Sequence, residues 1–346
     1  MSAFYLTKYT IFYYSFYMKN KIINISIIIS CIAIFIGLLF ISYFVFPFLL
    51  PIVPQSSNLE VDKEQNLINC NSTHLTVLQL TDIHLDDEFE TPFTFSKIKR
   101  LIYKSNPDLI VFTGDLFGDG CSKGGVEQFI DYMEDFKLPW AVVFGNHDNE
   151  TPYTLPELSN LFENAEYSLF KAGNLANFYG NYYYNINFAD NKKFQFIFMD
   201  SGQWNFSPDS AKFYDNAVNN AKTLNNGTLV NNFMFYHIPM VGWADAYRAY
   251  LNDEVVYSGV LKETNFFNTA STISLYERVK YYGVTKAMIC GHHHYNNVKM
   301  QHNGISFCQG LKTSISFYNH WSIIGGGTTY TLNSDGSFTY NDIFMI

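Results

Sequence analysis

The sequence PWAVVFGNHDNE, residues 139–150, joins a short apolar run to a cluster of polar side chains. Residues 140–144 are uncharged and mostly β-branched or aromatic, which is typical of a strand buried on both faces. Asn146, His147 and Asp148 follow directly, and side chains of these kinds build catalytic and metal sites. In α/β sheets such sites lie beyond the carboxyl ends of the strands. The stretch therefore predicts a layered α/β fold with a site at the end of this strand.

Apolar runs of this kind recur along the chain, each followed by polar residues. We expect strands at residues 75–80, 109–112, 140–144, 194–199, 232–236 and 285–289, and helices at 95–104, 126–136, 208–224 and 274–282. After Gly291 the chain has only strand-like runs, at residues 305–308, 328–332 and 338–343. A terminal block of strands predicts a second sheet packed on the first. We therefore expect an α/β fold of two packed mixed β-sheets, a β-sandwich flanked by helices.

Five polar clusters follow the predicted strands and carry carboxylate, imidazole and amide groups. They are TDIHL (81–85), TGDLF (113–117), FGNHDN (144–149), FYHIP (235–239) and CGHHHY (290–295). These groups together suit borderline metals such as Zn, Fe or Mn, whereas a structural zinc site is typically rich in cysteine. Each cluster alone is also compatible with a turn or a core histidine. The occurrence of all five in one chain favours a metal site.

The ordered series D-x-H, G-D, G-N-H-D, H and G-H-x-H resembles the calcineurin-like metallophosphoesterases over residues 75–320. The stretches PWAVVFGNHDNE, FQFIFMDSG and FYHIP are similar to the branch related to purple acid phosphatases, near members described as inactive. The resemblance implies the calcineurin-like phosphoesterase fold. One position departs from the pattern: purple enzymes carry a tyrosine ligand three residues after the G-D aspartate, where this chain has Gly118. We therefore expect no charge-transfer colour from a phenolate on iron.

The resemblance implies a centre with two divalent or trivalent metal ions, Fe, Zn or Mn. The implied ligands form two sets with one shared member: Asp82, His84 and His294 for one ion, Asn146, His237 and His292 for the other, and Asp115 bridging them. A shared carboxylate offsets the repulsion between two cations about 3.5–4 Å apart. A hydroxide bridging the ions would attack phosphorus in line with the departing oxygen, while both ions neutralise charge on the phosphoryl oxygens.

The resemblance also implies catalytic residues beside the metal ligands. His147 would stabilise the transition state or protonate the leaving alkoxide, and Asp148 would orient its ring. In the histidine triplet, alternate side chains of an extended segment share a face, so His292 and His294 can turn to the metals while His293 points away. Three other histidines lie outside the clusters: we interpret His74 and His302 as structural, and leave the role of His320 open.

Three functions are compatible with these residues. The first is a phosphomonoesterase, and the nearest alternative is a phosphodiesterase acting on nucleotides or phospholipid head groups. Both reactions need the same centre, so the pocket wall would separate them, and we expect that wall in residues 86–94, 149–158 and 241–267. The third, from a different class, is a catalytically inactive interaction scaffold on the same fold. Every expected ligand position is filled, and so is His147, so the sequence favours an enzyme.

Residues 22–46 are uncharged throughout and long enough to cross about 30 Å of hydrocarbon as a helix. Lysines precede this stretch and acidic residues follow it, so the positive-inside rule leaves the N-terminus in the cytosol and the remainder outside it. We expect a cytoplasmic segment at 1–21, a signal anchor at 22–46, a stalk at 47–72 and a catalytic domain at 73–346. Translation from Met18 would keep this orientation. The alternative is a cleaved signal and a secreted protein.

The 346 residues carry a net charge of −9, which argues against a nucleic-acid partner because a polyanion is normally met by a basic face. The expected partners are a phosphate-ester substrate and the membrane, and the sequence leaves the oligomeric state open. Asn-x-Ser/Thr triplets begin at Asn71, Asn149, Asn205 and Asn226, and are candidate glycosylation sites. Cys290 and Cys308 are the preferred disulfide pair because they flank a predicted turn between neighbouring strands.

Overall fold

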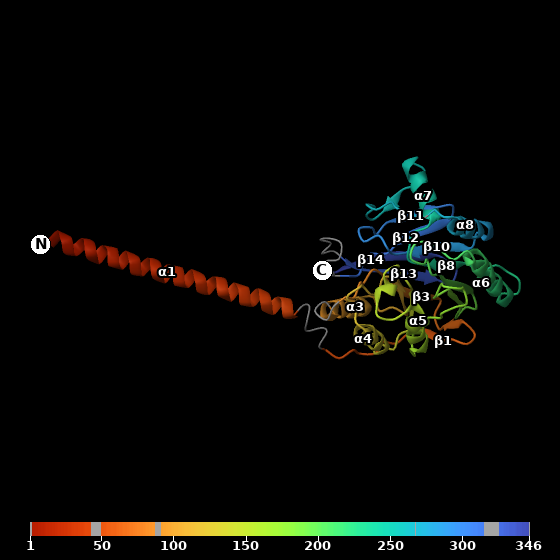
Figure 1. Cartoon of the computed structure of the whole chain (residues 1–346), viewed down its shortest axis with the longest axis horizontal. Helices are drawn as coiled ribbons and strands as arrows, with labels where there is room; N and C mark the ends of the chain where they lie inside the picture. Colours follow the sequence, from red (N-terminus) through yellow and green to blue (C-terminus); the bar gives the residue numbers. More distant parts are fainter. Residues whose placement is uncertain (1, 43–49, 87–90, 267, 315–324, 346) are drawn as a thin grey trace. The chain divides into compact units, whose positions relative to one another are not determined.

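The structure, a computed structural model, describes residues 2–42, 50–86, 91–266, 268–314 and 325–345. The chain forms two compact units, Met1–Leu50 and Pro51–Ile346. The first contains helix α1 (Ser2–Phe40), in which Tyr17–Leu39 is long and apolar enough to cross a membrane by length and composition (Figure 1). A signal sequence near an N-terminus meets the same two criteria. The end of the predicted span, residues 43–46, lies outside the described residues.

The second unit contains two mixed β-sheets (Figure 1). The larger has the strand order β1-β2-β6-β7-β8-β10-β12-β11-β9, and the smaller β14-β13-β3-β4-β5. The strands are β1 (Leu59–Asp62), β2 (Leu67–Cys70), β3 (His74–Leu80), β4 (Leu109–Thr113), β5 (Trp140–Val143), β6 (Tyr182–Phe188), β7 (Lys193–Phe198), β8 (Asn232–Phe235), β9 (Tyr257–Ser258), β10 (Thr285–Cys290), β11 (Lys299–His302), β12 (Ile305–Gln309), β13 (Gly325–Asn333) and β14 (Phe338–Met345). Strands β3, β4 and β5 are parallel, and so are β7, β8, β10 and β12. Within each set the carboxyl ends therefore share one edge of the sheet.

Helices cover the outer face of each sheet. They are α3 (Thr91–Ser105), α4 (Lys123–Glu134), α5 (Leu155–Asn164), α6 (Ser210–Leu224), α7 (Val241–Leu251) and α8 (Ala270–Tyr282). On the smaller sheet, the ring of Phe129 in α4 packs edge-on against Phe112 and Trp140, with centroids 5.3 and 6.4 Å away. On the larger sheet, Tyr214 of α6 and Trp243 of α7 belong to one buried apolar cluster with residues of β8 and β10. Figure 1 shows α3 and α4 on one side of this unit and α6, α7 and α8 on the other.

The inner faces of the two sheets meet at an apolar layer that contains one buried amide. The rings of Phe233 in β8 and Tyr330 in β13 lie 6.5 Å apart. The Gln79 side chain in β3 donates to Thr113 Oγ1 at 2.8 Å and to the carbonyl oxygen of Cys290 at 2.9 Å, and it accepts from the Tyr330 hydroxyl at 2.9 Å. A buried amide without partners would cost about 1–3 kcal/mol. These bonds therefore hold β3 and β10 together near the carboxyl ends of both strands.

The six strands predicted before Gly291 are confirmed to within one residue at each end, as β3, β4, β5, β7, β8 and β10. The four predicted helices correspond to α3, α4, α6 and α8. Helices α5 and α7 and strand β6 were not predicted. The sequence does contain a helix-start pattern for α5, because Thr154 and Glu157 form a capping box at its start.

The prediction that the terminal strands form a separate second sheet is wrong. Strand β12 pairs parallel to β10 in the larger sheet, and β11 joins β12 there. Strands β13 and β14 pair with β3 in the smaller sheet. Periodicity identifies a strand by its side-chain pattern, but the neighbour to which it hydrogen-bonds is set by long-range packing.

The predicted stalk at residues 47–72 is also wrong for the part that begins at Pro51, because this part is packed into the second unit. Strands β1 and β2 form a hairpin, and β2 extends the larger sheet by pairing parallel to β6. The Asn58 side chain donates to Asp108 Oδ1 at 2.9 Å, and Ile68 is fully buried. The segment is polar overall, but Leu59, Ile68 and Cys70 are buried in the core, and its backbone supplies the sheet pairing.

The predicted disulfide between Cys290 and Cys308 is wrong, and both thiols are free and fully buried. In the parallel pair of β10 and β12, Cys290 is opposite Gln309, and Cys308 is opposite Ile289. Successive side chains of a strand point to opposite faces, so the two thiols lie on different faces of the sheet. A disulfide requires Cβ atoms about 3.5–4.5 Å apart that point toward each other, which this register prevents.

Ile68→Ala tests the place of the β1–β2 hairpin in the core. In the chain from Pro51 onward, it should lower the free energy of unfolding by about 2–5 kcal/mol, because a fully buried isoleucine is truncated. Urea unfolding followed by circular dichroism measures the loss. The control is Ile273→Ala, the same change at a side chain that is 45% exposed, which should cost less than about 1 kcal/mol. Small and equal losses in both variants would favour a stalk instead.

Candidate functional site

All the sequence-predicted site residues lie just after the ends of parallel strands. Asp82, Asp115 and Asn146 follow β3, β4 and β5 of the smaller sheet, whereas His237 and His292 follow β8 and β10 of the larger one. The carboxyl edges of the two sheets face a common space, so side chains from both sheets meet there. Two groups of donor atoms result, each lying within 4.8 Å of one another: Asp82, His84, Asp115 and His294 in the first, and Asp115, His237 and His292 in the second.

The first group has the spacing of ligands around one metal ion. Nε2 of His84 lies 3.1 Å from Nε2 of His294 and 3.6 Å from Oδ2 of Asp115, and Nε2 of His294 lies 3.4 Å from Oδ1 of Asp82. Ligands bonded at about 2.1 Å to one ion, at angles near 90–110°, are separated by roughly 3.0–3.4 Å. The residues of this group therefore fit a divalent metal.

At the second group and at Asn146 beside it, two buried side-chain atoms lack hydrogen-bond partners among the described residues. Nδ1 of His237 lies 2.8 Å from the carbonyl oxygen of Thr113, which places the proton on Nδ1 and the lone pair on Nε2. That Nε2 lies 3.0 Å from Oδ2 of Asp115, but the two atoms are not aligned as a hydrogen bond. Oδ1 of Asn146 is buried without a partner as well. Acceptor atoms that face one another in this way fit a cation between them.

Asp82, Asp115, His84 and His292 have the protonation states that metal ligands need. Burial raises the pKa of both Asp82 and Asp115. A neighbouring histidine outweighs burial in each case, His294 at Asp82 and His237 at Asp115, so both pKa values lie well below the ordinary range. Burial lowers the pKa of His84 to about 4 and that of His292 to about 3. The carboxylates are therefore ionised and these two imidazoles neutral at pH 7, as metal binding requires. At His237, burial lowers the pKa but the neighbouring Asp115 outweighs burial and raises it to about 9, so a metal ion would displace a proton there.

Four of these residues have backbone conformations that side chains rarely adopt. The φ angles are +52° at Asp82, +45° at His84, +51° at Asp115 and +75° at His292. A positive φ at a residue other than glycine is strained, and it persists only where the surrounding structure holds it. The clustering of this strain at the strand ends indicates a site rather than ordinary turns.

The glycines that precede the ligands are required by close packing. A Cβ atom on Gly145 would lie 2.1 Å from Oδ1 of Asp115, and one on Gly291 would lie 1.9 Å from Oγ1 of Thr81. Both distances are shorter than any real Cβ contact. The glycine in G-N-H-D and that in G-H-x-H therefore allow the strand ends to approach each other closely enough for their side chains to share a centre.

His293 lies outside both groups, but the reason predicted from alternation is wrong. Residues 291–293 are not a strand, and the φ of His292 breaks the extended pattern. The His293 ring turns instead to Gln309, whose Nε2 lies 2.8 Å from its Nδ1, and to Asn296 at 3.3 Å. His74 and His302 belong to neither group, and His320 lies outside the described residues.

The predicted role of Asp148 as the partner of His147 is wrong. The Asp148 carboxylate is fully buried and accepts backbone N–H groups from Asp115, Leu116, Phe117 and Gly145 at 2.7–3.2 Å. Burial raises its pKa to about 7, with a further contribution from Asp115. Asp148 therefore ties the G-D loop to the G-N-H-D loop. Sequence reasoning chose it because it is adjacent to His147 in the chain.

Glu150, which sequence reasoning missed, is the carboxylate that contacts His147. Its Oε1 lies 2.8 Å from Nδ1 of His147, and both side chains are partly exposed. Burial lowers the pKa of His147, but Asp115 and Glu150 outweigh burial, so the net pKa is raised. The i,i+3 spacing within a short 3₁₀ turn, Asp148–Glu150, brings the two side chains together.

Gly118 stands where purple enzymes have a tyrosine ligand, and the structure leaves no space for a side chain there. A Cβ atom on Gly118 would lie 1.7 Å from Oδ1 of Asp86. The Asp86 carboxylate thus occupies the volume beside this glycine. The tyrosine position of the purple enzymes is thus a glycine in this chain, and the Asp86 side chain packs against it.

Members of both groups line a cavity of about 460 Å³. Its lining residues are Asp115, Asn146, His147, Trp204, Glu263, Asn265, His292, His293, His294 and Tyr295. Of the three wall segments predicted from the sequence, 241–267 contributes Glu263 and Asn265, and 86–94 lies partly outside the described residues. Trp204 comes from a loop after β7 that was not predicted to form the wall.

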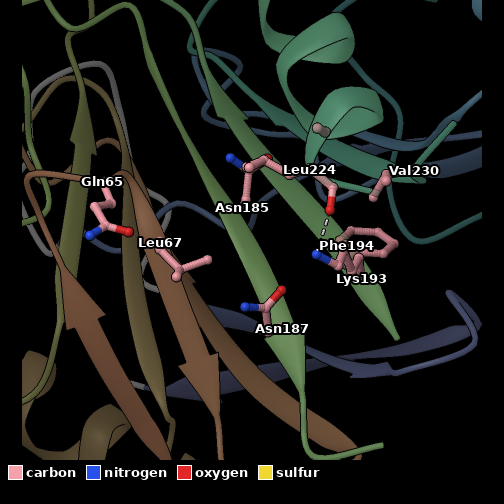
Figure 2. A pocket seen from close by; sticks show the side chains of 9 residues that line it. Gln65, Leu67, Asn185, Asn187, Lys193, Phe194, Leu224 and Val230 are labelled. Atoms are coloured by element: carbon pink, nitrogen blue, oxygen red, sulfur yellow. Dashed lines mark hydrogen bonds between the residues drawn. The ribbon is translucent and has the colours of Figure 1, made fainter. Parts of the chain in front are cut away.

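A second cavity, of about 130 Å³, lies near the start of β7, at the end of that strand away from the metal-type residues. Amide and apolar side chains line it, among them Asn185, Asn187 and Phe194 (Figure 2). Its lysine, Lys193, donates to the carbonyl oxygen of Leu224 at 2.7 Å. The described lining residues include no histidine or carboxylate, so the larger cavity is the candidate site.

Comparison with known proteins matches the sequence to one family. The model of the family described as "Calcineurin-like phosphoesterase" matches residues 75–296. The Arabidopsis thaliana protein named "Probable inactive purple acid phosphatase 29" is 26% identical over 62% of this chain and 61% of its own length, and "Probable inactive purple acid phosphatase 28" is 23% identical over 68% and 69%. The chain thus spans less than two thirds of the first. A dimetal phosphatase from Danio rerio has a TM-score of 0.51 over 78% of this chain and 95% of its own, at 11% identity, which indicates a shared fold.

Metal analysis of variants tests the two groups. Asp115→Ala should lose metal at both positions, because its carboxylate belongs to both, whereas His292→Ala should retain about one equivalent of the expected two. The measurement is elemental mass spectrometry of protein supplemented with Mn²⁺. His293→Ala is the matched control and should keep both ions. Metal loss in His293→Ala as large as in Asp115→Ala would contradict the division described above.

Proposed function

The chain belongs to the calcineurin-like phosphoesterase family, and on that premise we propose that it hydrolyses phosphate esters at a centre holding two metal ions. The observation that carries the proposal is the position of Asp115, whose carboxylate lies in both groups of potential metal ligands. The backbone N–H of His147 donates to Oδ1 of Asp115 at 2.9 Å, while Oδ2 of Asp115 faces His84 and His237. One carboxylate held in this way suits a bridge between two ions.

The proposed ligands follow the two groups. Asp82, His84 and His294 would hold one ion, Asn146, His237 and His292 the other, with Asp115 shared. Ions such as Fe, Zn or Mn, when bound, lower the pKa of water and neutralise charge on phosphoryl oxygens. The ligand types do not distinguish among these metals.

His147 is the proposed proton donor to the leaving oxygen. It lines the cavity, and its ring lies 5.1 Å from that of His84. Glu150 contacts Nδ1 of His147, so it positions the ring and favours the charged form, which leaves Nε2 as the donor toward the cavity. Asp148 has no direct part in this step, and its proposed contribution is to hold the loops that carry Asp115 and His147.

An interaction scaffold is the alternative from another class, because the two Arabidopsis relatives carry the word inactive in their names. Loss of catalysis is expected to leave gaps among the ligands or in the proton donor. In this chain all the expected residues are present, and Asp115, Asn146, His147, His292 and His294 line one cavity. This complete set supports an enzyme over a scaffold.

The substrate proposal begins with phosphomonoesters, as the sequence suggested, and one observation favours phosphodiesters as a second candidate. The described residues that line the cavity include no lysine or arginine, and Glu263 adds a carboxylate. A phosphate monoester carries up to two negative charges, whereas a phosphate diester carries one. A wall without cations is less unfavourable for the singly charged ester.

Hydrolysis assays on the metal-loaded protein test the proposal. We expect hydrolysis of p-nitrophenyl phosphate or of bis(p-nitrophenyl) phosphate, measured as release of p-nitrophenol. The ratio of the two rates assigns the ester class. Binding of about two metal equivalents without hydrolysis of either compound would support the scaffold instead.

Three variants separate the roles near His147. His147→Ala should lower kcat by about 10²–10⁴-fold with both metals retained, because a general acid is removed. Glu150→Gln should give a smaller loss in kcat and a shifted pH profile, because the ring keeps a neutral partner. Asp148→Ala should instead lower stability by about 3 kcal/mol or more, measured by thermal unfolding, because several buried N–H groups lose their acceptor. A stable Asp148→Ala variant with the kinetics of His147→Ala would restore the original assignment.

We also propose that the catalytic unit lies outside the cytosol and is tied to a membrane by the apolar stretch Tyr17–Leu39. The charge asymmetry around this stretch supports the orientation. The asparagines of the four glycosylation triplets, Asn71, Asn149, Asn205 and Asn226, are all exposed and so are accessible for modification. With a net charge of −9, we expect no nucleic-acid partner.

Protease treatment of sealed microsomes tests this orientation. The catalytic unit should be protected, and its apparent mass should fall after glycosidase treatment, because it would lie in the lumen. Digestion of the unit while the vesicles stay intact would place it in the cytosol. A protected product that lacks residues 1–50 would indicate a cleaved signal instead of an anchor.

A further inference from the structure

We propose that Trp204 recognises an aromatic group on the substrate, by stacking against the part of the ester beyond the phosphoryl group. The inference rests on the proposed function and adds to it a substrate class, aryl or heteroaryl phosphate esters. Trp204 lines the same cavity as the metal-type residues, and its ring centroid lies 6.3 Å from that of His292, with the planes 82° apart. The indole therefore stands beside the centre and is not stacked on that imidazole.

Trp204 differs in exposure from the other two described tryptophans. It is 59% exposed, whereas Trp140 and Trp243 are completely buried. An exposed indole forgoes the free energy that burial of its apolar surface would supply. At the mouth of a cavity, the same surface is available to a ligand with an aromatic face.

The loop that presents Trp204 is braced on its N-terminal side. The buried Asp200 carboxylate accepts from the N–H of Gly202 at 2.7 Å and from the N–H of Tyr179 at 2.9 Å. Gly202 has a φ of +59°, and a Cβ atom there would lie 2.5 Å from the carbonyl oxygen of Asn205. The turn before Trp204 is therefore tight and requires glycine.

The loop is also braced after Trp204. Phe206 is 1% exposed and belongs to the buried cluster beneath α6, α7 and α8. The Thr269 hydroxyl donates to Oδ1 of Asn205 at 2.5 Å. The backbone on both sides of Trp204 is thus anchored while its side chain is left exposed, so a ligand would meet a platform that is already ordered.

The remainder of the cavity wall fits an uncharged aromatic group better than an anionic one. Glu263 accepts from the N–H of Tyr295 at 2.8 Å, which fixes a carboxylate in the wall. No lysine or arginine occurs among the described lining residues. The group that leaves the phosphorus is therefore bound by contact with ring surface and not by charge pairing.

Ligand binding by the full chain, in detergent and loaded with Mn²⁺, tests the inference without relying on turnover. The probes are phenylphosphonate and methylphosphonate, which share the phosphoryl group and differ in the ring, and Kd is measured by calorimetry. We expect Trp204→Ala to weaken phenylphosphonate about tenfold, equivalent to ~1.4 kcal/mol, and methylphosphonate by less than about twofold. Trp204→Phe should keep most of the preference. Tyr281→Ala, at an aromatic side chain that is 73% exposed near the end of α8, should change neither Kd.

Each other outcome overturns the inference in an identifiable way. Equal weakening of both phosphonates in Trp204→Ala would mean that the residue supports the centre and does not read the ring. An unchanged preference for phenylphosphonate would mean that the ring binds elsewhere. Tighter binding of 2-aminoethylphosphonate than of phenylphosphonate would assign the indole to a cation instead. Binding of Mn²⁺ without binding of any phosphonate would contradict the proposed function itself, and the inference with it.

Discussion

The site depends on the hydrogen bonds that the buried carboxylate of Asp148 accepts. This carboxylate accepts hydrogen bonds from backbone N–H groups in the segment after β4 and in the segment after β5, at distances of 2.7–3.2 Å. Without this acceptor, the N–H groups of Asp115, Leu116, Phe117 and Gly145 would lose the hydrogen bonds that they donate to it. The bonds hold the loop that carries Asp115 beside the loop that carries Asn146. Asp148 therefore acts on the chemistry only through geometry, although it is adjacent to His147 in the sequence.

The second constraint is that the centre is assembled from two sheets. Asp82, Asp115 and Asn146 belong to the smaller sheet, and the histidines after β8 and β10 belong to the larger one. Gln79 bonds across this junction, and Gly291 permits contact with Thr81 that no larger residue would allow. The positive φ angles of four ligand residues show that the backbone is strained where the sheets meet. This strain is offset by the surrounding packing, and bound metal would offset it further because oriented ligands need no rearrangement.

Three further features of this chain lie around the metal-type residues and not among them. Asp86 fills the space beside Gly118, where a tyrosine would otherwise stand. Glu150 contacts the ring of His147, and Trp204 stands at the mouth of the cavity on an anchored loop. A family match covering residues 75–296 shows the family, and under the proposed function the walls of the cavity decide which ester can enter it.

The sequence by itself determined the positions of six strands along the chain, the metal-type residues at their ends and the apolar stretch near the N-terminus. These features are local: a strand shows in its apolar run, and a ligand cluster shows in the few residues that follow it. Only the tertiary structure decided that β12 and β13 belong to different sheets, that Ile68 is core, and that Cys290 and Cys308 face apart. It also decided that Glu150, and not Asp148, contacts His147, and that Trp204 reaches the cavity. Each of these depends on which distant segments pack together, and the free energy of that packing comes from contacts across the whole chain, which no short stretch of sequence contains.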